Sequence, residues 1–345
     1  VVVVVVAAAA AAVNASASSS ASAPRPLPPP SRSLLDPATA TGGGGGNKRI
    51  VGGTPVDPDR YPYMASVRYG RVSESLKHQC TGTLIAPDLV VTAAHCVDAA
   101  HEIEIGRYDL DDQGRPHVDY ERFLIDEFST HPRYVHLPDE LSYDVMLIKL
   151  YGTSTAAPVR TNRALTVPSE SGESLTVAGW GYVQDGDRIP SDVPMEIETA
   201  FITLEQCAEA EGTQAAWVYD EENGEWIEED VTVNVGDMGY LRDHMMCDLI
   251  SGGGACQGDS GGPLLKIGRE NEPGTDVQVG TVAFGFECGH DELPNVNVDL
   301  AHPEIRDLWL DPEVCRLSGY PPADFNCEPR GGAGAGGVQG GGGMG

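Results

Sequence analysis

Short apolar runs separated by Gly, Pro and Asp fill the middle of the chain. They lie at 64–69, 82–94, 145–150, 175–180, 262–267 and 277–284. Many short strands between turn residues are typical of an antiparallel sandwich or barrel. Helical periodicity is weak, and the best helical segment is 302–310 (HPEIRDLWL). The pattern predicts an all-β protein with a helix near its C-terminal end.

One segment is strongly acidic. Residues 217–230 (WVYDEENGEWIEED) contain seven Asp or Glu residues and no Lys or Arg. A charge run of this kind is usually solvated. We therefore expect a surface loop here rather than a site for a cation or a partner.

The two ends differ in composition from the middle. Residues 1–13 are all Val or Ala and are followed by small residues, as in a secretory signal; a low-complexity tail is the alternative. Residues 24–49 are Pro-rich and then Gly-rich, and residues 331–345 are Gly-rich, so neither stretch can bury a core. We expect an N-terminally incomplete signal peptide at 1–23, then a propeptide, a folded unit from about 50 to 330, and a disordered tail.

Charge and cysteine content restrict the function. The 345-residue chain has 52 acidic and 22 basic side chains and a net charge of −30. This balance argues against nucleic acid or an anionic membrane as partners, because both attract a basic face. No apolar run reaches the ~18 residues of a membrane-spanning helix. Eight cysteines without a C-x-x-C pair favour disulfides, and so a secreted protein, over a zinc site. Their spacing alone leaves the pairing open.

Four local motifs follow one another along the chain. They are RIVGG (49–53), TAAHC (92–96), DVMLI (144–148) and CQGDSGGP (256–263). Taken together, they resemble the chymotrypsin-like (trypsin-type, S1) serine endopeptidases from Ile50 to about Leu310. The resemblance implies two six-stranded antiparallel β-barrels with the active site between them, a peptidase domain at 50–312 and a C-terminal extension at 313–330.

The chemistry of these residue types agrees with the resemblance. A serine hydroxyl is a weak nucleophile at neutral pH and needs a base, and histidine suits that task because its ordinary pKa lies near 6.5. A carboxylate then fixes the imidazole tautomer. By motif, Ser260 is the nucleophile, His95 the general base and Asp144 the orienting carboxylate. The N–H groups of Gly258 and Ser260 are the expected oxyanion hole.

These motifs also fit other classes of protein. Residues 258–262 also fit the G-x-S-x-G turn of α/β-hydrolases, but that fold needs a helix after the serine and the order Ser, Asp, His. Here Pro263 follows and the order is His, Asp, Ser. A catalytically inactive protease-fold binding module is the main alternative, although all three triad residues are present. A structural protein that interacts through its acidic surface is a further alternative.

The resemblance also implies a disulfide framework. The C-terminal pair should close the extension at 313–330. The implied pairs are Cys80–Cys96, Cys207–Cys247, Cys256–Cys288 and Cys315–Cys327.

The resemblance also implies how the protease is activated. Lys48-Arg49 precedes Ile50 and follows a flexible Gly run, so the bond is accessible to a protease. The resemblance implies a zymogen that is cleaved after Arg49 by an activating protease. The freed Ile50 ammonium would pair with Asp259, beside the nucleophile.

The specificity pocket departs from that of trypsins. The position of their pocket-floor aspartate is Gly254, followed by Ala255; Gly285 leaves the mouth open, and Asn295 replaces the usual glycine of the far wall. Neither Asp248, directly after Cys247, nor Asp259, the expected partner of Ile50, takes the role of that aspartate. A buried substrate cation would lack a partner, so we expect a preference for uncharged side chains. Entry of Glu287 or Asp291 into the pocket is the alternative.

Two further departures concern ligands. Trypsins open their calcium loop with a glutamate, and the matching residue is Arg107. A cation there disfavours calcium, which needs several oxygen ligands, although Asp109, Asp111 and Asp112 keep that alternative open. The usual Ser-Trp-Gly reads Ala283-Phe284-Gly285, so one hydroxyl next to the triad carboxylate is missing. We expect no metal and no organic cofactor, a monomer, and protein or peptide substrates, with protein inhibitors as further partners.

Overall fold

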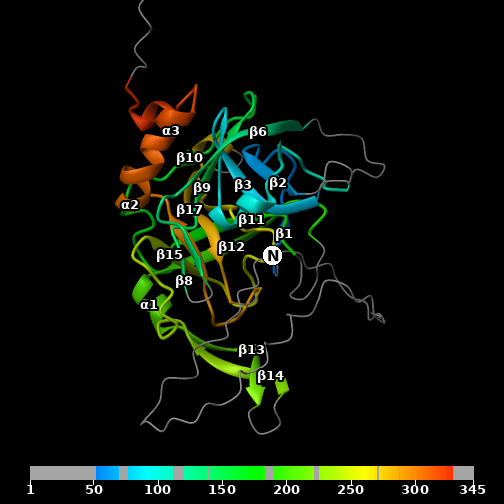
Figure 1. Ribbon diagram of the computed structural model, residues 1–345, viewed down its shortest axis with the longest axis vertical. Coiled ribbons are helices and arrows are strands. Elements are labelled where there is room, and N and C mark those ends of the chain that lie inside the picture. Colours follow the sequence, from blue (N-terminus) through cyan, green and yellow to red (C-terminus); the bar gives the residue numbers. More distant parts are fainter. Residues whose placement is uncertain are drawn as a thin grey trace, which may run out of the picture.

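The computed structural model describes residues 52–69, 77–111, 120–137, 140–182, 190–220, 225–269, 272–286 and 288–328. The expected signal peptide (1–23), propeptide (24–49) and tail (331–345) lie outside the described residues, as do Arg49 and Ile50. Figure 1 shows two strand-rich lobes, a helical segment at one end and a hairpin that projects from the other.

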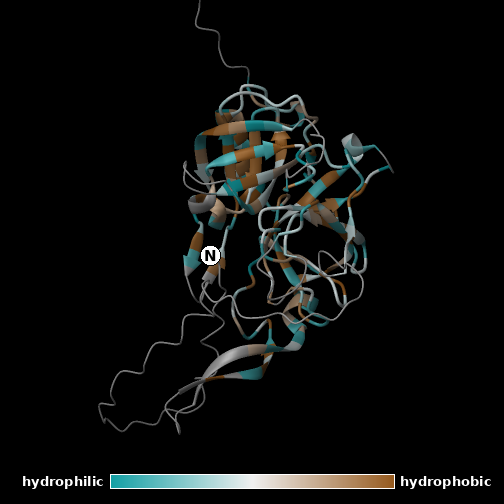
Figure 2. Cartoon of the chain, turned by 90° about the vertical axis from the view of Figure 1, so that its right-hand side faces the viewer, coloured by the Kyte–Doolittle hydropathy of each residue, from teal (hydrophilic) through white to brown (hydrophobic). Residues whose placement is uncertain are grey.

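The first lobe is a closed antiparallel barrel of six strands in the order β2-β3-β4-β9-β6-β5. Its core is aliphatic: Val67, Leu84, Ile103, Leu147 and Ile148 have no exposed surface. Burying such side chains is the main driving force for folding. In Figure 2 hydrophobic residues gather in the barrel strands. The bounds are β2 Met64–Tyr69, β3 Lys77–Ala86, β4 Leu89–Thr92, β5 Glu102–Ile105, β6 Glu121–Thr130 and β9 Met146–Leu150.

The second lobe is also a closed six-stranded barrel. Its strands follow the order β12-β11-β16-β17-β18-β15, and pairing of β12 with β15 closes the ring. Strands β1 and β10 add to its outside, on β12 and β17. The two barrels confirm the predicted fold class. The bounds are β1 Thr54–Pro55, β10 Arg160–Thr161, β11 Ser174–Gly179, β12 Met195–Ile202, β15 Met245–Leu249, β16 Pro263–Lys266, β17 Val277–Phe284 and β18 Asn295–Asp299.

The acidic segment is not a loop, as the sequence predicted, but part of a hairpin. Strands β13 (Glu211–Asp220) and β14 (Glu225–Asn234) pair in antiparallel register from Glu211↔Asn234 to Asp220↔Glu225. The run contains Trp, Val, Tyr and Ile as well as carboxylates. Aromatic and β-branched residues favour strands, and this preference outweighs the charge.

The C-terminal helical segment packs against the first barrel. α2 (Pro303–Ile305), a π-helical turn η3 (Arg306–Leu310) and α3 (Asp311–Leu317) follow directly on one another, so the helix passes through the expected boundary at 312. The buried Asp88 carboxylate accepts hydrogen bonds from Ser318 Oγ and from Gly319 N (2.8 Å). These contacts fix the end of the helix on barrel one, close to the Cys315–Cys327 disulfide.

The remaining elements are short. A capping box formed by Thr203 and Gln206 begins α1. The bounds are β7 Val135–Leu137, β8 Glu140–Ser142, α1 Leu204–Glu209, and the 3₁₀ turns η1 Ala94–Ala99, η2 Pro273–Thr275 and η4 Ala323–Phe325. Within the part of the chain that the structure describes, no helix has the length and apolar character to cross a membrane.

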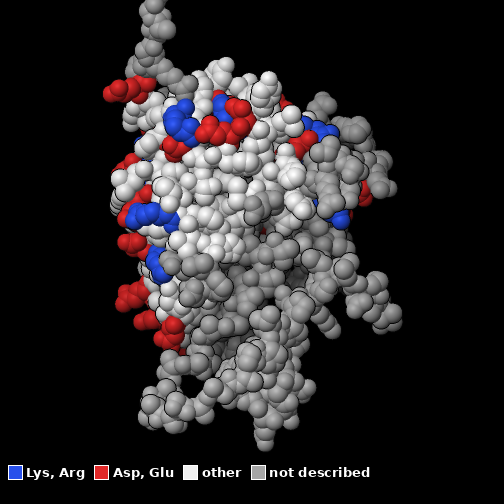
Figure 3. Space-filling model, viewed as in Figure 1, with Lys and Arg blue, Asp and Glu red and all other residues white. Residues whose placement is uncertain are grey.

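Charges are unevenly distributed on the surface. Figure 3 shows acidic side chains along the edge of the described part of this face, with few basic groups between them. This agrees with the formal charge of −30.

Candidate active site

A histidine and an aspartate from the first barrel form the core of the site. His95 lies in η1, three residues after the end of β4, and Asp144 lies two residues before the start of β9. Asp144 Oδ2 is 2.7 Å from His95 Nδ1, and Asp144 Oδ1 accepts a hydrogen bond from His95 N at 2.9 Å. Both side chains are almost fully buried. Because the carboxylate accepts at both oxygens, it fixes the ring orientation and places the proton of a neutral imidazole on Nδ1, so Nε2 can act as a base.

The turn that carries Ser260 precedes β16 of the second barrel and lies close to this pair, with Ser260 O 3.9 Å from Cys96 Sγ. This carbonyl oxygen accepts a hydrogen bond from Thr81 N at 3.0 Å. Thr81 follows Cys80, which is disulfide-bonded to Cys96, the residue after His95. These links join the serine turn to β3, and the Cys80–Cys96 disulfide joins β3 to the turn η1 that carries His95. The Ser260 hydroxyl itself makes no hydrogen bond to the residues that the structure describes.

The turn around Ser260 presents two unused backbone donors. Gln257 O accepts from Tyr182 N and Asp259 O accepts from Gly262 N, both at 2.8 Å. In a trans peptide the N–H points away from the carbonyl, so the N–H groups of Gly258 and Ser260 face away from these partners. Neither donates to another described residue. Gly258 adopts φ +99°, a backbone conformation that glycine adopts readily.

Asp259 is completely buried beneath the turn. Its Oδ1 accepts from Gly181 N at 2.7 Å and its Oδ2 from Cys256 N at 2.9 Å. A Cβ at Gly181 would lie 2.1 Å from Asp259 Oδ2, so only glycine leaves room for this carboxylate. No described cation pairs with Asp259, and burial raises its pKa to about 7 although the two N–H donors act the other way.

His78 braces the same turn and was missed by the sequence analysis. The buried ring lies between Ser66 Oγ (2.8 Å from Nδ1) and Gly258 O (3.0 Å from Nε2). Thr81 Oγ1 donates to the same Gly258 oxygen at 2.9 Å. Both ring nitrogens are engaged, which holds the Gly258–Asp259 peptide in place. No motif marks this histidine, because the arrangement joins residues 180 positions apart.

Burial of His78 predicts an acid sensitivity of folding. Burial lowers the pKa of His78 to about 3, whereas an unfolded histidine titrates near 6.5. The unfolded chain therefore binds an extra proton between these values, and stability falls as the pH drops from about 6.5 to about 3. We expect the free energy of unfolding of H78Q to depend less steeply on pH than that of the wild type, as measured by urea denaturation at several pH values. An equal pH dependence of the free energy of unfolding in the two proteins would contradict this contribution of His78. Burial also lowers the pKa of His244, to about 4, but His244 is present in both proteins and its effect cancels in the comparison.

Tyr143, the residue before Asp144, is clamped between two imidazoles. Its ring stacks on His131 at 4.5 Å and on His244 at 3.9 Å between centroids. Its backbone has φ +52°, a left-handed conformation that costs energy for a residue with a side chain. His244 Nε2 accepts from Tyr143 N at 3.1 Å. The stack holds the strained turn that presents Asp144 to His95.

The predicted pocket residues lie together, and Asp248 joins them. A Cβ on Gly254 would lie 2.8 Å from Asn295 Nδ2, and one on Gly285 would lie 3.1 Å from Asn295 Oδ1. Ala255, next to Gly254, is buried. Asn295 Nδ2 donates to Asp248 at 3.1 Å, so Asp248 contacts a residue that the sequence analysis assigned to the pocket. Glu287 lies outside the described residues, and Asp291 accepts from Ser251 Oγ at 2.8 Å.

Four disulfides surround these elements, and their pairing is the one that the family resemblance implies. Cys256–Cys288 joins the serine turn to the segment after Gly285, and Cys207–Cys247 holds α1 against β15. The other two are Cys80–Cys96 and Cys315–Cys327. Because Cys80 and Cys96 are bonded to each other, their grouping with His95 does not form a metal site.

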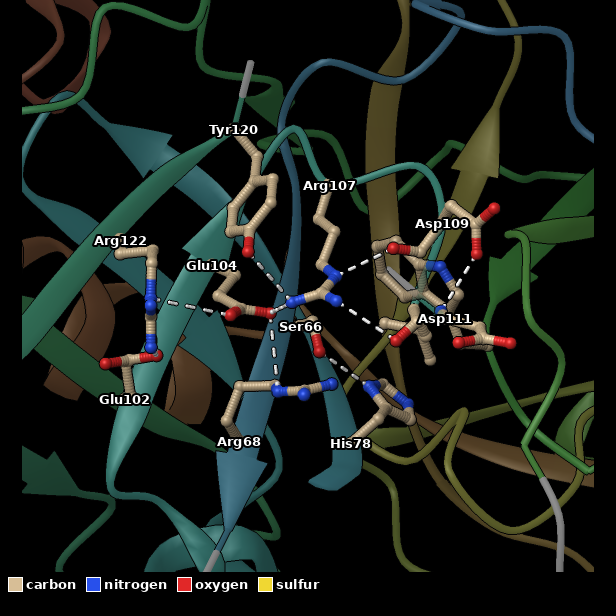
Figure 4. A network of polar contacts seen from close by, with 12 residues as sticks. Ser66, Arg68, His78, Glu102, Glu104, Arg107, Asp109, Asp111, Tyr120 and Arg122 are labelled. Atoms are coloured by element: carbon tan, nitrogen blue, oxygen red, sulfur yellow. Dashed lines mark hydrogen bonds and ion pairs between the residues drawn. The ribbon is translucent and has the colours of Figure 1, made fainter. Parts of the chain in front are cut away.

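A guanidinium occupies the loop that the resemblance matches with the calcium loop of trypsins (Figure 4). The buried Arg107 donates to Glu104 Oε2 at 2.7 Å, to Asp109 O at 2.8 Å and to Leu110 O at 3.0 Å. These are the oxygen ligands that a hard cation would need. Asp109 Oδ1 accepts from Asp111 N at 2.8 Å, and Asp112 lies outside the described residues. In this loop the positive charge of Arg107 therefore takes the place that a bound cation would have.

Two six-stranded barrels, with a His–Asp pair on one and a serine in a glycine-rich turn on the other, define a serine hydrolase of the double-barrel class. A sequence model of the trypsin family, described as "Trypsin", matches residues 50–303. The chain therefore belongs to the trypsin family and is a serine-type endopeptidase.

Individual relatives agree with this assignment. The chain is 28% identical to U21-ctenitoxin-Pn1a of Phoneutria nigriventer, over 76% of this chain and 98% of that protein. It is also 28% identical to trypsin delta of Drosophila melanogaster, over 73% of this chain and 85% of the relative. Among solved structures, mouse neuropsin, a serine protease, aligns with a TM-score of 0.54 at 23% identity, over 73% of this chain and 95% of the other. That likeness shows the fold alone.

Proposed function

We propose that the chain hydrolyses peptide bonds through an acyl-enzyme on Ser260. His95 Nε2 takes the Ser260 proton as the oxygen attacks the scissile carbonyl, and returns it to the leaving amine. Asp144 stabilises the resulting imidazolium. Water then attacks the ester, with His95 again as the base. The observation that carries the proposal is the buried His95–Asp144 pair beside a serine turn with two unused N–H donors.

The oxyanion is the second part of the proposed mechanism. The N–H groups of Gly258 and Ser260 would bind the negative oxygen of each tetrahedral intermediate. Preorganised donors of this kind are worth several kcal/mol in catalysis. Support comes from the hydrogen bonds to the flanking carbonyls of Gln257 and Asp259, because these turn both N–H groups away from the flanking backbone.

We further propose that the protein is secreted as a zymogen, with signal peptide, propeptide, peptidase domain at 50–312, extension at 313–330 and tail as laid out above. Four disulfides fit an oxidising compartment. Cleavage after Arg49 would release the Ile50 ammonium, and the buried Asp259 is the partner that this cation would find. A buried carboxylate without a cation is unfavourable, so pairing would order the serine turn. An activating protease, protein inhibitors and a monomeric state belong to the same proposal.

The inactive binding module is the second candidate. Loss of a triad residue would favour it, but His95, Asp144 and Ser260 are all present, and the His95–Asp144 hydrogen bond is formed. Hydrolysis of a peptide library by the protein cleaved after Arg49 separates the two candidates. Turnover supports the protease, and its absence in a correctly processed protein supports the binding module.

Substrate preference follows from the pocket. Asn295 places an uncharged amide between Gly254 and Gly285. Burial of a substrate cation there without an anionic partner would weaken substrate binding by several kcal/mol. We expect kcat/KM for substrates with Arg or Lys before the scissile bond to lie at least ~10-fold below that for the best uncharged residue. Peptide amides that differ only at this position measure the ratio. Efficient cleavage after Arg, lost in D291N or E287Q, would contradict the preference.

A further inference from the structure

A fully buried carboxylate lies behind the residues of the predicted specificity pocket. Asp248 and Asn297 have no exposed surface, and Thr199 is 3% exposed. Asp248 Oδ2 accepts from Thr199 Oγ1 at 2.8 Å and from Asn295 Nδ2 at 3.1 Å, and Oδ1 accepts from Asn297 Nδ2 at 2.7 Å. β15 pairs with β18 so that Asp248 lies opposite Asn295. One side-chain amide, that of Asn295, thus connects this carboxylate with the pocket.

Asn295 stands between the carboxylate and the space beside the nucleophile. Its amide lies against the two glycines that form the pocket walls, Gly254 and Gly285. A Cβ on Gly254 would lie 2.8 Å from Asn295 Nδ2 and 3.3 Å from Asn295 Oδ1, and a Cβ on Gly285 would lie 3.1 Å from Asn295 Oδ1. An ionised carboxylate only accepts hydrogen bonds, so Nδ2 is the atom directed at Asp248. Asn295 is 7% exposed. It therefore shields Asp248 from anything that enters between the walls.

The walls adjoin Ser260. Gly254 comes six residues before the nucleophile. At the end of β17, just before Gly285, Val282 exchanges hydrogen bonds with Gly261 (2.8 Å) and Gly262 (3.0 Å). A substrate side chain next to the bond under attack by Ser260 would therefore meet Asn295 before it could reach Asp248.

We propose that Asn295 is a plug that decides the specificity of this protease: it restricts the pocket to short uncharged side chains and hides a latent site for basic ones, formed by Asp248. This proposal rests on the proposed proteolytic function. Without the Asn295 side chain, Asp248 Oδ2 would lose one of its donors and become an acceptor for a cation.

A second group at the same place lacks a partner. Asn297 Oδ1 is buried and accepts no hydrogen bond from any residue of the described chain, while its Nδ2 is bound to Asp248. Buried acceptors are normally satisfied. A guanidinium has five N–H donors in a planar fork, so it could satisfy both the Asn297 oxygen and the freed carboxylate oxygen. A neutral side chain could not do this and also balance the negative charge.

The test compares N295G with the double variant D248N/N295G. We expect N295G to raise kcat/KM for cleavage after Arg or Lys ~10²-fold over the wild type, because a close charge pair with the substrate cation can strengthen binding across the interface. D248N/N295G has the same open pocket without the charge and should lose the gain. Cleavage after an uncharged residue serves as the reference in all three proteins, and thermal unfolding checks that each is folded.

Binding of benzamidinium, a flat cation, separates this proposal from the proposed function, because it requires no turnover. Calorimetry should show binding to N295G but not to the wild type or to D248N/N295G. If N295G binds the cation but hydrolyses nothing, the plug is supported and the proteolytic function fails. Absence of both binding and cleavage after Arg in folded N295G would overturn the proposal, as would a gain that persists in D248N/N295G.

Discussion

Replacement of Ser260 by alanine should lower kcat for peptide hydrolysis about 10⁶-fold, since the members of such a triad act as a unit. Ser260 is the only residue on its turn that offers a hydroxyl, and this hydroxyl makes no hydrogen bond to the described chain. Its loss should therefore change the stability little. Initial rates on the best peptide substrate measure the effect.

The matched control is S174A, which removes an exposed hydroxyl on β11 that bonds to Glu198 at 2.7 Å. We expect its turnover to equal that of the wild type. Thermal unfolding of both variants should fall close to the wild-type midpoint. Wild-type turnover in folded S260A would end the assignment of the nucleophile.

Replacement of Asp259 by asparagine should leave cleavage after Arg49 unchanged but reduce activity ~10²–10³-fold, the typical loss when an oxyanion-hole donor is removed. Burial raises the pKa of Asp259 to about 7 in the absence of a described cation. A nearby ammonium favours the ionised form, so pairing with Ile50 should lower this pKa and order the serine turn. An amide at this position cannot form the ion pair.

Two further proteins complete this experiment. R49Q should resist the activating protease and remain inactive, and D291N removes a carboxylate that is bound to Ser251 on the surface, so its activation should be normal. N-terminal sequencing follows processing, and amide hydrolysis follows activity. A precursor as active as the processed enzyme would rule out this activation mechanism.

Site residues that lie within short sequence motifs could be predicted without the structure. TAAHC and CQGDSGGP place His95 and Ser260 within stretches of five and eight residues, and the strand at 64–69 coincides with β2. The disulfide pairing also agreed, because it came with the family and not from spacing. Apolar runs predicted strands well where both faces are buried, as in β4 (Leu89–Thr92).

Features that depend on three-dimensional proximity could not be predicted in this way. The hydrogen bond between Asp248 and Asn295 exists because β15 pairs with β18, 47 residues apart in sequence. The clamp on Tyr143 joins it to His244, 101 residues away. The prediction for hairpin β13–β14 was wrong for another reason: we gave its acidic residues more weight than its aromatic and β-branched residues, which favour strands. Helix α1 did have a local signal, Thr203 followed by Gln206, which is the sequence of a capping box.

The most direct test of the central claim is covalent labelling with a fluorophosphonate, followed by mass spectrometry of the labelled peptide. A fluorophosphonate reacts only with a serine that a neighbouring base activates and whose developing oxyanion is stabilised. We predict one adduct per molecule, on Ser260, after cleavage at Arg49 and little before it. An adduct on another residue, or none in the correctly processed protein, would contradict the assignment of Ser260, His95 and Asp144 as the catalytic site.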